Sequence, residues 1–185
     1  MKKVIEIHEV NLDIIKKIIN LDLKNCILTF DDGLASQWHF IDDLIALDVP
    51  KIFFISTDII CDRVDNQSKE FIKCSEAHKK AFEGNKENYM TWSQIKTLSK
   101  MPNCYIGGHS HKHKLYSVSP LKDLYINLSN DSENMLEEFK KKNIEIDKFC
   151  FPYNEDYDGI YRILLSKLGI ENFYGKERIS IEDIE

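Results

Sequence analysis

Residues 26–33, Cys-Ile-Leu-Thr-Phe-Asp-Asp-Gly, join a short apolar run to two adjacent carboxylates and a glycine. An apolar run bounded by a turn signal predicts a buried strand, with Asp31 and Asp32 at its end. Two carboxylates this close repel each other unless a cation lies beside them or one of them holds a proton. Groups at the ends of strands in α/β sheets often carry out chemistry. The alternative is a solvated turn, which Asp-Asp-Gly on its own favours.

Strand-like and helix-like segments alternate on both sides of this stretch. The apolar patterns predict strands over residues 4–8, 26–30, 51–57, 104–108, 148–153 and 170–174. Helical spacing of apolar residues predicts helices over residues 11–23, 36–47, 91–100, 119–142 and 156–168. This alternation predicts an α/β fold with a parallel sheet, and a small or incomplete (β/α) barrel accommodates the count.

Residues 58–88 interrupt this alternation because they are polar, charged and only weakly periodic. They are interpreted as an insertion with one possible helix, over residues 68–82. The length of 185 residues fits one domain, so a single domain over residues 1–185 is expected to carry the insertion.

The overall composition excludes some classes of function. The net charge of −6, from 25 basic and 31 acidic side chains, argues against a nucleic-acid-binding protein, which needs a basic surface. No apolar stretch reaches the length of a membrane span. Residues 1–8 begin like a signal peptide but lack its long apolar region, so secretion by that route is not expected.

The five cysteines indicate a reducing environment rather than a disulfide framework. Cys26, Cys104 and Cys150 fall in strand-like runs and are expected to be buried thiols. Cys61, Cys74 and His78 form a conceivable metal cluster, but their spacing fits no known pattern, so no metal is expected there. A cytoplasmic location is the default expectation.

Residues 109–113, His-Ser-His-Lys-His, contain three of the six histidines. On one helical turn, His109 and His113 would face the same way, a spacing that lets two imidazoles bind one metal. No acid lies between them, so Asp31 and Asp32 would have to supply a third ligand and a base. His111 is expected to face solvent or to support a ligand. The alternative is a polar loop whose histidines occur by chance.

These motifs resemble those of the polysaccharide deacetylase family (NodB homology domain, carbohydrate esterase family 4). The family's first motif, T-F-D-D-G, stands intact at residues 29–33, and its second, H-[ST]-x-x-H, stands at residues 109–113. The resemblance covers roughly residues 4–175, nearly the whole chain. It implies a NodB-like deacetylase fold.

The third motif departs from the common pattern of this family. Many members have R-x-P-Y, but residues 150–153 read Cys-Phe-Pro-Tyr, without the arginine. One branch has F-x-x-P-Y instead, and residues 149–153 are similar to it. In that branch a histidine in a short N-terminal strand acts as the acid, and His8 after Ile5-Glu6-Ile7 is similar. What orients Asp31 without the arginine stays open.

The resemblance implies a role for each matching residue. Asp32, His109 and His113 would hold a divalent metal, with zinc as the default and cobalt, nickel or iron tolerating the same ligands. Asp31 would be the general base that takes a proton from the attacking water.

Two further roles follow from the same resemblance. The backbone N–H of Tyr153 would help to hold the oxyanion, and His8 would protonate the leaving amine. His111 stays open as an alternative acid, and a purely structural role stays open for His8.

The expected function is therefore metal-dependent removal of an N-acyl group, with N-acetyl the simplest case, from a sugar. The substrate would be a nucleotide-linked, lipid-linked or oligomeric N-acylated sugar, and surface polysaccharide biosynthesis is a setting suggested by analogy. Hydrolysis of a non-sugar amide on the same site is one alternative. A non-catalytic relative that binds a glycan or a metal is another.

Overall fold

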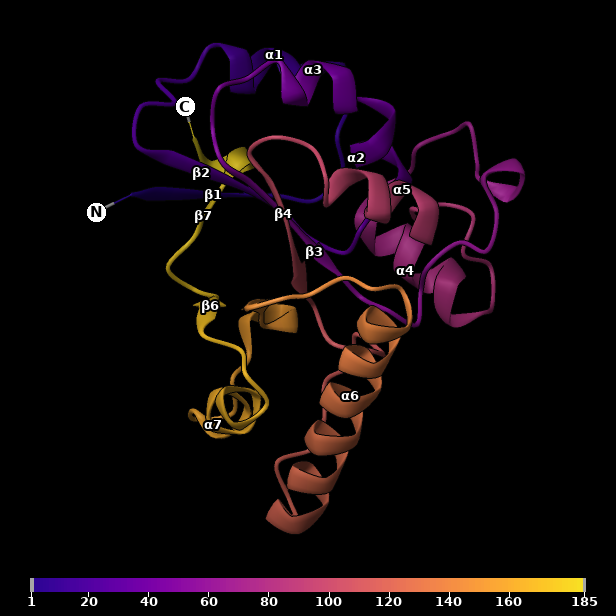
Figure 1. The fold of residues 1–185 in the computed structure, drawn as a ribbon, viewed down its shortest axis with the longest axis vertical. Helices are drawn as coiled ribbons and strands as arrows, with labels where there is room; N and C mark the ends of the chain where they lie inside the picture. Colours follow the sequence, from indigo (N-terminus) through magenta and orange to yellow (C-terminus); the bar gives the residue numbers. More distant parts are fainter. Residues whose placement is uncertain (1, 185) are drawn as a thin grey trace.

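A computed structural model describes residues 2–184 as a curled parallel sheet with helices around it (Figure 1). The seven strands are β1 (Lys3–Ile7), β2 (Cys26–Phe30), β3 (Lys51–Ile55), β4 (Cys104–Gly108), β5 (Lys148–Cys150), β6 (Asn172–Tyr174) and β7 (Ile179–Ser180). Their order across the sheet is β6-β5-β4-β3-β2-β1-β7, and every pairing is parallel. The sheet forms a half-barrel, which confirms the predicted incomplete (β/α) barrel.

The helices occupy most of the predicted segments. They are α1 (Leu12–Ile19), α2 (Ala35–His39), α3 (Ile41–Ile45), α4 (Cys74–Phe82), α5 (Trp92–Leu98), α6 (Leu121–Lys141) and α7 (Ile160–Lys167). Three short 3₁₀ segments lie at Val64–Asn66, Pro152–Asn154 and Ile181–Asp183. None of the helices described between residues 2 and 184 is long and apolar enough to cross a membrane.

The prediction of one helix over residues 36–47 was wrong. Two short helices, α2 and α3, meet there at Phe40, whose φ of −98° and ψ of 21° break the helical path. The apolar spacing continues across the break, so the pattern alone could not reveal it. The possible helix over residues 68–82 begins only at Cys74.

The two faces of the sheet have different environments. Alternating strand residues such as Leu28, Phe53 and Phe149 pack with the helices in the main core. The residues between them, such as Ile52 and Phe54, form a smaller cluster on the inner face. Because both faces of the sheet are buried, the strand sequences are nearly continuous apolar runs.

The connection from β6 to β7 closes the open side of the half-barrel. These two strands form opposite edges of the sheet, yet only residues 175–178 separate them in the chain. Five Cα–Cα steps reach about 18 Å at most, so the two edges must lie near each other. β7 pairs with β1, and this strand was not predicted from the sequence.

The insertion is anchored by a small core of its own. Ala77 and Ala81 of α4 pack with Leu34, Ile59 and Tyr89, and all five side chains are buried. This cluster fixes α4 beside the end of β2, because Leu34 follows the Asp31-Asp32-Gly33 turn directly.

We expect Gly107→Ala to destabilise the protein by about 1–3 kcal/mol, the usual cost of forcing extra atoms into a packed core. A Cβ at Gly107 would lie 2.6 Å from two ring atoms of Phe54, which is fully buried and has no room to move. Gly175→Ala is the control, because its nearest neighbours would lie 3.5 Å away. Urea unfolding of both variants measures the difference, and equal losses would contradict this packing of the inner face.

Candidate active site

One pocket, of about 970 Å³, gathers the six residues to which the family resemblance assigns a role. Its lining includes His8, Asp31, Asp32, His109, His113 and Tyr153. They come from the ends of β1, β2 and β4 and from the segment after β5. The carboxyl ends of parallel strands therefore meet here, as expected for a catalytic site in this class of fold.

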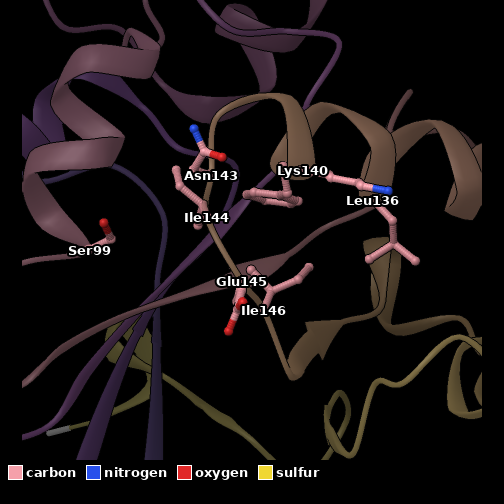
Figure 2. A pocket seen from close by; sticks show the side chains of 8 residues that line it. Ser99, Leu136, Lys140, Asn143, Ile144, Glu145 and Ile146 are labelled. Atoms are coloured by element: carbon pink, nitrogen blue, oxygen red, sulfur yellow. The ribbon is translucent and has the colours of Figure 1, made fainter.

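A second cavity, of about 740 Å³, lies against α5 and α6, away from these residues (Figure 2). Leu136, Phe139, Ile144 and Ile146 form its apolar part, and Lys140 and Glu145 are its charged side chains. Its lining includes no histidine, cysteine or aspartate.

Asp32 lies at the centre of a group of imidazoles. Its Oδ1 atom is 3.3 Å from His109 Nε2, 3.1 Å from His113 Nε2 and 3.4 Å from His78 Nε2. The two nitrogens of His109 and His113 are 3.2 Å apart. His109 Nδ1 lies 2.8 Å from the carbonyl oxygen of Cys150, so a proton on Nδ1 leaves Nε2 free to act as a ligand.

The predicted helical turn for residues 109–113 was wrong, although the predicted convergence of the two imidazoles was right. The segment is an irregular loop in which Ser110 (φ 66°) and His113 (φ 51°) have left-handed backbone conformations. The Ser110 hydroxyl accepts a hydrogen bond from the His113 N–H at 2.9 Å, which fixes the turn.

Asp32 and Tyr153 also have positive φ, at 73° and 57°. Such strained conformations persist mainly at functional sites.

The donors around Asp32 suit a divalent metal ion. Asp32 Oδ1 is buried and has no hydrogen-bond partner among the described residues, although three imidazole nitrogens lie 3.1–3.4 Å away. The corners of a tetrahedral zinc site lie about 3.3–3.6 Å apart, given bonds of about 2.0–2.2 Å. A cation among these donors would satisfy the orphaned oxygen.

Asp31 has a different partner, Arg178. The guanidinium donates to Asp31 Oδ1 at 2.7 Å and to Glu6 Oε1 at 2.8 Å, and its side chain is 1% exposed. Arg178 belongs to the connection between β6 and β7. From there it reaches Asp31, so the chain has a guanidinium beside this carboxylate although the third motif lacks its arginine. The Cys150 thiol lies 3.6 Å from Asp31 Oδ2.

Neighbouring groups lower the pKa of both aspartates despite their complete burial. Burial alone would raise the pKa of Asp31, but the Arg178 guanidinium holds that pKa below its ordinary value. Burial would likewise raise the pKa of Asp32, but the imidazoles of His113 and His109 hold it well below the usual range. Each carboxylate is thus stabilised by its own positive or hydrogen-bonding neighbours.

His8 follows β1 directly and lies beside both carboxylates. Strand β1 pairs in parallel with β2, with Ile7 opposite Phe30, so His8 and Asp31 leave the sheet together. A ring nitrogen of His8 lies within 4.8 Å of ligand atoms of Asp31 and of Asp32. His111 does not line this pocket; its Nδ1 lies 2.8 Å from the Thr57 hydroxyl. The geometry therefore favours His8 over His111 as a group that faces the site.

Tyr153 also lines this pocket. Its ring lies 4.8 Å from that of His113, and its side chain is half exposed. No described residue accepts a hydrogen bond from its backbone N–H. That N–H is available to an oxygen of a bound molecule.

Reasoning from the sequence missed two members of the site. His78 was set aside with Cys61 and Cys74 because their spacing fits no known metal pattern, yet α4 carries His78 and Cys74 against Asp32. Their spacing of four residues, the same as that of His109 and His113, was the available signal. Arg178 could have been found from the need to neutralise Asp31, because the chain has only three arginines.

Comparisons with known proteins agree with this geometry. The model of the polysaccharide deacetylase family matches residues 19–173. A search of curated proteins returns no significant match.

Several solved structures share the fold at low sequence identity. IcaB from Ammonifex degensii aligns with a TM-score of 0.69 and 15% identity, over 97% of this chain and 84% of that one. A de-N-acetylase from Aggregatibacter actinomycetemcomitans has a TM-score of 0.63 and 13% identity, over 97% and 77%. The deacetylase domain of BpsB from Bordetella bronchiseptica has a TM-score of 0.64 and 12% identity, over 97% and 94%. These similarities establish the fold, and the family match covers most of the sequence. The chain is therefore a member of the polysaccharide deacetylase family.

Proposed function

We propose that this protein is a metal-dependent hydrolase that removes an N-acyl group, acetyl in the simplest case, from a sugar. One observation carries the proposal: two adjacent buried carboxylates have separate partners, Arg178 for Asp31 and a group of imidazoles for Asp32. A site that only bound a ligand would not need this division. The name of the family and the description of one structural neighbour as a de-N-acetylase support the same reaction.

Asp32, His109 and His113 would hold the metal, for which zinc is the first choice. Two imidazoles and one carboxylate are common zinc ligands, and cobalt, nickel or iron accept them as well. When bound, the cation would polarise the acyl carbonyl and lower the pKa of a water molecule.

Asp31 would act as the general base. Its carboxylate is charged and held in place, because Oδ1 is engaged by Arg178. The other oxygen, Oδ2, has only the weak thiol contact of Cys150 at 3.6 Å. It is therefore the atom that would accept the proton of the attacking water.

The remaining groups would complete the hydrolysis. The free backbone N–H of Tyr153 would stabilise the negative charge that develops on the carbonyl oxygen. His8 would donate a proton to the nitrogen as the C–N bond breaks, so that a neutral amine leaves. The products are a carboxylate and an amino sugar.

We place this reaction in the assembly of a surface polysaccharide, on a nucleotide-linked, lipid-linked or oligomeric N-acetyl sugar. The family supports a carbohydrate substrate, and all five cysteines are free thiols, as is usual for proteins of the reducing cytoplasm. Acetate release from a panel of these three substrate types by the zinc-loaded protein tests the proposal. Zinc binding without turnover of any of them would favour a non-sugar amide or a non-catalytic role.

Asp31→Asn and Asp32→Asn should have different effects. Asp31→Asn should retain zinc but lose about 10²–10⁴-fold in turnover, because an amide cannot accept the proton. Asp32→Asn should lose zinc itself, because a neutral amide is a weaker ligand. Elemental analysis and acetate release measure both properties, with His111→Ala as a control that keeps its metal. Equal loss of zinc in both aspartate variants would rule out this assignment.

Arg178→Met should lower the free energy of unfolding of the metal-free protein by about 3–5 kcal/mol, since it leaves Asp31 buried without its cation. Arg63→Met removes an exposed ion pair with Asp65 and should cost less than about 1 kcal/mol. The double variant Arg178→Met/Asp31→Asn should recover part of the loss. If it were no more stable than Arg178→Met, the loss would come from packing rather than from the unpaired charge.

His8→Ala should lower the turnover of an N-acetyl sugar by about 10²–10⁴-fold, the usual loss when a general acid is removed. Its zinc content should stay unchanged. The loss should be much smaller for an activated ester, whose leaving group needs no proton. Steady-state rates on the two substrates provide the comparison, and equal losses on both would show that His8 does not protonate the leaving group.

A further inference from the structure

Helix α4 places two side chains against the far side of Asp32. Cys74 and His78 are one turn apart on this helix, and both line the pocket. Ala77 and Ala81 anchor the same helix in the small core of the insertion. The position of Cys74 and His78 is therefore set by packing and does not depend on a flexible loop.

Hydrogen bonds around Cys74 define the state of the His78 ring. The Cys74 thiol donates to Asp32 Oδ2 at 2.9 Å, and its sulfur lies 3.5 Å from His78 Nδ1. With its proton on the carboxylate, the sulfur can only accept from Nδ1–H. In the neutral imidazole with its proton on Nδ1, Nε2 carries no proton and has a free lone pair.

This nitrogen faces a carboxylate oxygen with which it makes no hydrogen bond. His78 Nε2 and Asp32 Oδ1 are 3.4 Å apart, both are buried, and neither has a hydrogen-bond partner among the described residues. The lone pairs of the imidazole nitrogen and the carboxylate oxygen repel each other at this distance unless a proton or a metal cation lies between them. The separation also falls within the range expected for two ligands of one zinc ion, about 3.3–3.6 Å.

We propose that His78 is a fourth protein ligand, which joins Asp32, His109 and His113. The inference rests on the proposed metal site and extends it with a residue from the insertion. The rings of His78 and His113 lie nearly parallel, with centroids 4.2 Å apart. Because a metal binds in the plane of an imidazole, these two rings must turn out of this stacked arrangement to bind one ion together.

A fourth protein ligand changes how the site holds its metal. Catalytic zinc sites usually have three protein ligands and an open position, whereas sites with four hold the metal more completely. His78 is therefore expected to strengthen metal retention in the resting protein, and the proposed hydrolysis then needs a fifth position on the metal for water. The Cys74 thiol supports it by orienting both the imidazole and Asp32, as outer groups do in other metal sites.

X-ray absorption at the zinc edge tests the ligand count directly. The zinc-loaded wild type should show three imidazoles, and His78→Ala should show two. The zinc dissociation constant, measured by competition with a chelator, should rise at least about 100-fold in His78→Ala, beyond the usual effect of an outer group. His39→Ala is the matched control, because His39 packs on Phe40 and Phe71 outside the site and its loss should leave both measurements unchanged.

The outcomes separate this inference from the function on which it rests. Two imidazoles in a wild type that binds one zinc and hydrolyses its substrate would overturn the role of His78 and leave the proposed function intact. A wild type that binds no zinc would overturn both. The wild-type spectrum needs no variant, so the test holds even if His78→Ala fails to fold.

Discussion

Two negative charges on neighbouring residues, Asp31 and Asp32, are buried at the end of one strand, and each is only 1% exposed. Burying two unpaired carboxylates would cost more free energy than the fold can supply, so each carboxylate needs its own partner. Arg178 reaches Asp31 from the connection that closes the half-barrel, and imidazoles reach Asp32 from the segment after β4 and from α4. Electrostatic interactions with the two carboxylates thus bring together segments that are distant in the sequence.

This arrangement places two chemically equal side chains in unequal environments, which suit the different roles proposed for them. A carboxylate paired with a guanidinium is fixed and stays charged, which suits a proton acceptor. A carboxylate surrounded by imidazoles forms with them a set of ligands that suits a metal cation. The alternation of β2 separates the two, because Asp31 continues the inner-face series of Ile27 and Thr29, whereas Asp32 turns away with a positive φ of 73°.

Local patterns predicted much of this structure. The apolar run before Asp31, the alternation of strands and helices and the pair His109/His113 are all short-range signals, and they identified the half-barrel and most of its site. The insertion gave no such signal, because α4 is held by a small core that forms only when Leu34, Ile59 and Tyr89 come together. Arg178 and the two-residue strand β7 were missed for the same reason: their places depend on the closure of the sheet, and no periodicity marks them.

The central claim is that the metal belongs to Asp32 while Asp31 stays outside its ligands, paired with Arg178. Diffraction from crystals of the zinc-loaded protein, collected at the zinc absorption edge, tests this most directly. The account predicts one strong anomalous peak among Asp32, His109 and His113, with the ion pair between Asp31 and Arg178 intact. A zinc ion that bridges Asp31 and Asp32, with Arg178 displaced, would contradict it.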